Sequence, residues 1–182
     1  MVPKRQPLLL LLIFVRTTCL PRVPRRLQGA YTQLKFTATD AAPESYFGAG
    51  VALDGDVLAV AATDVVWDDG GWAAPDSGSA YVIRTTDGQM TKLMTADGND
   101  VQGASVAVDG GTLVFGAPFD DDFGSNSGAV HVFRTTDGGA TYVEVAKLTA
   151  CDAAAGDFFG WSVAIDGDTI VCLLYTSDAA DE

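Results

Sequence analysis

Hydrophobic and polar residues alternate with a period of two along much of the chain, and clusters of turn residues interrupt the alternation. This pattern is typical of β-strands, whose successive side chains point to opposite faces of a sheet. It predicts four strands in the middle of the chain, at Ser105–Val108, Leu113–Phe115, Ala129–Arg134 and Tyr142–Leu148. The Asp109-Gly110 pair predicts a tight hairpin between the first two strands, because such a turn needs a positive φ angle at its centre.

This unit occurs nearly three times, with Gly48, Gly103 and Gly160 at equivalent positions 55 and 57 residues apart. An Asp-Gly pair between two alternating runs follows each of these glycines. About four antiparallel strands per repeat form the blade of a β-propeller. The sequence therefore predicts an all-β fold of about two and a half four-stranded blades in an incomplete ring, within residues 28–171. Its units span about 33–91, 92–146 and 147–171.

Short signatures mark the ends of strands in these units. Phe47-Gly48 and Phe159-Gly160 open the first and third units, and Gly116-Ala117-Pro118 follows the second strand of the middle unit. These signatures resemble the FG-GAP repeats of integrin α-subunit propellers and related surface proteins. The middle unit departs from the pattern with Gln102-Gly103, and the first unit departs from it with Ala61-Ala62-Thr63. The resemblance implies a propeller fold but no particular ligand, since propellers host many unrelated activities.

The number of units is too small to close a ring, because propellers typically have ~4–8 blades. We therefore interpret the sequence as part of a longer one, in which residues 31–37 resemble the last strand of a blade. Residues 172–182 break the repeat in the middle of a strand and resemble the translation of a sequencing adapter, so we interpret them as an artefact. The alternative is a divergent terminal strand containing Leu173, Leu174 and Tyr175.

The first 27 residues indicate a secretory leader. Lys4-Arg5 precede the apolar run Leu8–Val15, which is too short to cross a bilayer. A leader predicts an extracellular or cell-surface protein. The alternatives are an incorrect gene start and an uncleaved anchor, which the arginines after the apolar run favour.

Charge excludes one class of partner. Six of the eleven Lys and Arg residues lie in the first 26 positions, so the rest of the chain carries five basic against 24 acidic residues. Nucleic-acid binding needs a basic surface and is therefore not expected. The three cysteines have no paired spacing, which supports neither a disulfide framework nor a zinc site.

Two acidic loops are candidate binding sites. Trp67, Asp68, Asp69 and Trp72 lie on a glycine-rich loop and are candidates for a carbohydrate or cation site. We favour the alternative, in which the two tryptophans pack over a neighbouring blade, because aromatic side chains usually find apolar cover. In the middle unit, Asp120, Asp121 and Asp122 are candidate calcium ligands, because calcium takes carboxylate oxygens. We favour the alternative, a solvated acidic loop, because their spacing is not that of a calcium-binding loop.

The family resemblance adds no cation site to these two loops. In integrin-type repeats the calcium loop joins the first two strands of a blade. Here those positions are tight turns, at Asp109–Gly111 and Asp166–Asp168. No integrin-like cation loop is therefore expected, and no cofactor other than calcium is considered.

Catalytic chemistry has no sequence support. His131 is the only histidine, and its alignment with Tyr81 predicts a position on a strand surface rather than a catalytic base. No GxSxG, HExxH, P-loop or zinc spacing occurs. We therefore expect a non-catalytic protein that serves binding, adhesion or a structural scaffold.

The expected partners are a protein or glycan ligand and the neighbouring blades of a longer protein. Membrane contact is expected only through an uncleaved leader or a further C-terminal part. The alternative function is the propeller portion of a larger secreted enzyme, whose catalytic domain lies outside these residues.

Overall fold

A computed structural model describes residues 34–38, 45–64, 67–68, 71–72, 78–93 and 105–175. The chain divides into two compact units, Met1–Pro43 and Glu44–Glu182, and every described strand lies in the second. Residues 34–38 are not in a strand, although the sequence predicted one over residues 31–37. The predicted leader, residues 1–27, lies outside the described residues. Within the described residues, no helix is long and apolar enough to cross a membrane.

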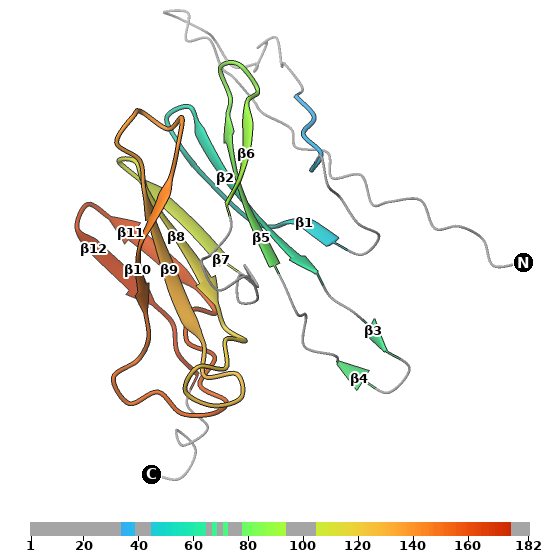
Figure 1. The fold of residues 1–182 in the computed structure, drawn as a ribbon, viewed down its shortest axis with the longest axis vertical. Helices are drawn as coiled ribbons and strands as arrows, with labels where there is room; N and C mark the ends of the chain where they lie inside the picture. Colours follow the sequence, from blue (N-terminus) through green and yellow to red (C-terminus); the bar gives the residue numbers. More distant parts are fainter. Residues whose placement is uncertain are drawn as a thin grey trace, which may run out of the picture. The chain divides into compact units, whose positions relative to one another are not determined.

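The second unit is built from antiparallel sheets (Figure 1). The first blade has the strand order β1-β2-β5-β6, formed by β1 (Ser45–Asp54), β2 (Val57–Asp64), β5 (Gly78–Arg84) and β6 (Met90–Leu93). The second blade is formed by β7 (Ser105–Asp109), β8 (Thr112–Ala117), β9 (Ala129–Arg134) and β10 (Val143–Leu148). The third is the hairpin of β11 (Val163–Asp166) and β12 (Thr169–Cys172). A short hairpin, β3 (Trp67–Asp68) and β4 (Gly71–Trp72), lies between β2 and β5.

The predicted all-β blades are confirmed. The four strands expected between residues 105 and 148 are present, with bounds that differ by no more than two residues. Each blade runs in chain order from its first strand outward, apart from the β3–β4 insertion. The first strands also lie next to one another across blades, because β7 packs against β1 on one side and β11 on the other. This is the arrangement of successive propeller blades.

The Asp-Gly turns join the blades as well as the strands. Gly110 and Gly167 have φ angles of 53° and 57°, as the predicted primed turns require. The aspartate that precedes each turn reaches into the next blade. Asp54 Oδ2 accepts a hydrogen bond from the backbone N–H of Gly110 at 2.9 Å, and Asp109 Oδ2 accepts one from Gly167 at 2.6 Å. The repeat of this contact explains why aspartate recurs there.

A core of complementary side-chain sizes holds the first two blades together. The first blade contributes a face of small residues and the second a face of large ones, and the buried cluster contains Ala59, Ala61, Ala80, Val82, Leu93, Leu113, Phe115 and Phe133. Phe115 and Phe133 meet edge to face with their ring centroids 5.9 Å apart. All of β8 and nearly all of β9 is buried. Burial on both faces shows that blades stack on either side of the second blade.

The second and third blades touch through their backbones. A Cβ atom on Gly116 would overlap the carbonyl oxygen of Gly160, and one on Gly128 would overlap the backbone of Phe159. Gly128 and Phe159 form a parallel bridge, and Ser105 Oγ donates a hydrogen bond to the Gly160 carbonyl at 2.9 Å. The Phe-Gly pair of one unit therefore packs directly on the Gly-Ala signature of the preceding unit.

We expect Gly116→Ala to destabilise the chain by about 3 kcal/mol, because the added methyl group must separate two blades. Gly167→Ala is the matched control: its Cβ meets nothing within 4 Å, so only the positive φ of 57° opposes it, at about 1 kcal/mol. Urea denaturation of the two variants measures both values. Equal destabilisation would contradict the close approach of the blades.

Candidate functional site

A bulge in β10 gathers charged side chains on one face of the second blade. The pairing of β10 with β9 shifts by one residue between Glu144 and Ala146. Glu144 therefore lies opposite Phe133, and Lys147 lies opposite His131. Because Phe133 and His131 share a face, the bulge places Glu144 and Lys147 on that face too.

The imidazole of His131 is buried, so its predicted position on a strand surface is wrong. The side chain has no exposed area, and its Nδ1 lies 2.7 Å from Oε1 of Glu144. The sequence correctly predicted that His131 points to the other face of β9 from Val130 and Val132. However, the first blade covers the face that carries His131, so neither face of β9 is solvated. Glu144 satisfies one ring nitrogen in place of water.

The acidic loop between β8 and β9 is organised around Asp120, which is about 1% exposed. Its Oδ1 accepts a hydrogen bond from the Asp122 N–H at 3.0 Å, and its backbone carbonyl accepts bonds from Ser127 Oγ and the Gly128 N–H. The ammonium group of Lys147 lies 2.6 Å from Asp120 Oδ2 and 2.8 Å from Asp122 Oδ2. The expectation of a fully solvated loop is therefore wrong for Asp120, while Asp121 and Asp122 are exposed.

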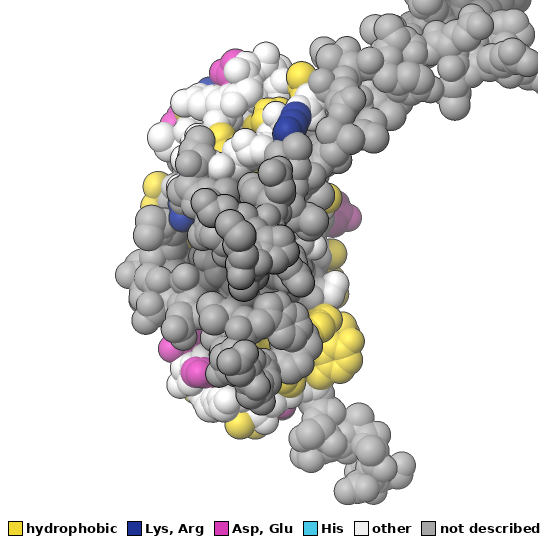
Figure 2. Space-filling model, turned by 90° about the vertical axis from the view of Figure 1, so that its right-hand side faces the viewer, with side chains coloured by type: hydrophobic (Ala, Val, Ile, Leu, Met, Phe, Trp, Pro, Cys, Tyr) yellow, Lys and Arg dark blue, Asp and Glu magenta, His cyan; other side chains and the backbone are white. Residues whose placement is uncertain are grey.

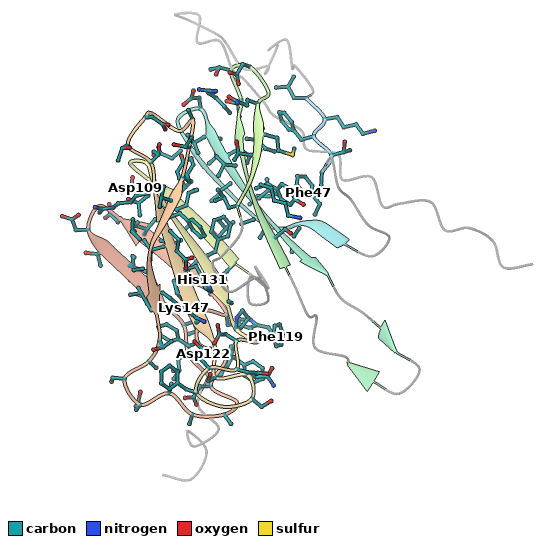
Figure 3. All side chains as sticks on the ribbon, in the orientation of Figure 1. Phe47, Asp109, Phe119, Asp122, His131 and Lys147 are labelled. Carbon is teal, nitrogen blue, oxygen red and sulfur yellow. The ribbon has the colours of Figure 1, made fainter. Side chains whose placement is uncertain are left out.

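The two carboxylates hold Lys147 in its charged form. Burial by itself lowers the pKa of Lys147, but hydrogen bonds to Asp120 and Asp122 and their negative charges outweigh it, so the pKa is raised above its usual value. Figure 3 shows Lys147 between His131 and Asp122. The ammonium group of Lys147 thus supplies the positive charge beside Asp120 and Asp122, the candidate calcium ligands. Among the described residues, no group of three or more His, Cys, Asp or Glu side chains is arranged to hold a metal ion.

Among the buried polar groups that the structure describes, His131, Glu144 and Ser127 are not linked in one chain of hydrogen bonds. His131 and Glu144 form an imidazole–carboxylate pair, and the hydroxyl of Ser127 donates to the carbonyl of Asp120. In the described part of the chain, Nε2 of His131 has no hydrogen-bond partner. The cluster joins β9, β10 and the acidic loop, which is a structural role.

A second set of loops lies at the same end of the second and third blades. The backbone N–H groups of Gly156, Phe158 and Phe159 donate to carbonyls of residues 125–127, at 2.9 to 3.1 Å. These bonds fasten the acidic loop to the segment that leads into the third blade. Phe158 adopts a φ angle of 49°, which is rare for a bulky residue. The loop pair is therefore a rigid and locally strained surface.

Aromatic side chains cover this loop pair. The rings of Phe119, Phe158 and Trp161 contact one another edge to face with centroids 5.9 to 6.1 Å apart, and Tyr175 contacts Trp161 in the same way. The side chains of Trp161 and Phe123 are 43% and 58% exposed. Figure 2 shows hydrophobic side chains exposed among polar ones on the face that it displays. We name the surface formed by residues 119–128 and 154–162 the loop-end surface.

The first predicted ligand loop is partly described. Trp67 and Trp72 are paired residues of the short hairpin β3–β4, and Asp68 lies beside them on β3. Asp69 lies outside the described residues. The backbone pairing brings the two tryptophan positions together, as a shared binding or packing role requires.

Sequence reasoning missed three features of this region. It did not identify Lys147, Glu144 or the aromatic loop-end surface as site residues. The recurrence of lysine at Lys92 and Lys147 was a signal, because both lie opposite an equivalent residue, Tyr81 or His131. The bulge that turns Glu144 toward His131 had no such signal.

We expect Lys147→Met to destabilise the protein by about 2–3 kcal/mol, because the buried Asp120 loses its counter-charge. The raised pKa of Lys147 means that its contribution is complete below the unfolded pKa, about 10.4, and is lost only as pH rises further. The difference from wild type should therefore persist from neutral pH to about pH 10 in urea denaturation.

Two further variants complete this test. Asp122→Asn removes only the exposed partner of Lys147 and should cost less than about 1 kcal/mol. Adding Asp120→Asn to Lys147→Met should restore part of the lost stability, because the unpaired buried charge is removed. Unchanged stability of Lys147→Met would show that the ion pair does not hold the loop.

Comparison with known proteins tests the resemblance that the signatures suggested. A search of curated proteins found no match. The FG-GAP repeat family matches three segments, residues 31–83, 88–133 and 142–180, which together cover most of the chain. These segments contain the three blades and the packed Phe-Gly and Gly-Ala signatures. The chain therefore belongs to the FG-GAP repeat family.

Proposed function

We propose that this chain is a non-catalytic binding module of an extracellular or cell-surface protein, in which propeller blades present loops to a protein or glycan ligand. The loop-end surface is the observation that carries this proposal. On this surface the side chains of Trp161 and Phe123 are exposed to solvent, whereas large aromatic rings are usually buried when a protein folds. Exposed aromatic side chains beside polar groups are enriched where proteins bind partners.

The loop-end surface is also fixed before any ligand binds. Three backbone hydrogen bonds join its two segments, and Phe158 is held at a strained backbone angle by its neighbours. Strain of this kind persists only where surrounding contacts impose it, and it gathers at ligand-binding sites. A rigid surface loses little conformational entropy on binding, which favours affinity. A bare scaffold has no need of such a surface.

The binding test uses two probes, a printed array of glycans and an array of purified extracellular protein domains. We expect the chain to bind at least one probe, and Trp161→Ala to weaken that binding by about ten-fold or more, as removal of an aromatic anchor does. Val143→Ser is the matched control, because Val143 is 65% exposed but lies on β10, away from the loops.

The result has a clear contrary outcome. Binding that is equally strong in the Trp161→Ala and wild-type chains would place the ligand elsewhere. An absence of binding on both arrays would overturn the proposed binding function. Circular dichroism of the variants confirms that each keeps the wild-type fold.

The extracellular location has its own prediction. Residues 1–27 contain an apolar run that follows positive charges, as export signals do. We expect a reporter enzyme fused after residue 40 to be exported, and Leu10→Arg with Leu11→Arg to abolish export by interrupting the run. Leu34→Arg, outside the run, is the control and should leave export unchanged. A reporter that stays inside the cell with the natural leader would contradict the proposed location.

A further inference from the structure

We draw no further inference here: the strongest candidate, the side-chain cluster of His131, Glu144, Lys147 and Asp120 between β9, β10 and the acidic loop of the second blade, belongs to the site already described, and nothing among the described residues points to a ligand for the buried Nε2 of His131.

Discussion

Close stacking of one blade on the next is the constraint on which the rest of this structure depends. Blades pack face to face, so the central strands of the second blade are buried on both sides. Small residues on the face of the first blade pack against large ones on the face of the second blade. Between the second and third blades, the backbones are in contact at Gly116 and Gly160. Interiors packed at this density tolerate little added volume. The glycine signatures of the repeat therefore record a steric requirement.

Stacking also decides how charged residues are used. A strand that would be half solvated in a single sheet has two covered faces here, so His131 and Asp120 are buried and need partners. Glu144 and Lys147 provide them, and the bulge in β10 is what turns both toward the same face. The carboxylates of the acidic loop were candidate metal ligands. Two of them are instead paired with the ammonium group of Lys147 in the same blade.

The surfaces left for recognition are the two ends of the blades, where strands give way to turns and loops. At one end, loops fastened by backbone hydrogen bonds expose aromatic rings. At the other, tight turns are linked from blade to blade by the aspartates that precede them. The strands, which are similar in the two four-stranded blades, form the scaffold. The connections, which differ in length and sequence, form the surfaces that can contact a ligand.

The sequence by itself determined the strands, the hairpin turns, the repeat and the family, because alternation and Asp-Gly pairs act locally and recur in each unit. It also pointed to the acidic loop at Asp120. The tertiary structure decided that His131 is buried and that Lys147 neutralises this loop. Those outcomes depend on which blade covers which face and on a bulge that changes side-chain direction. A local pattern cannot contain this information, because the contacts join residues brought together only by stacking.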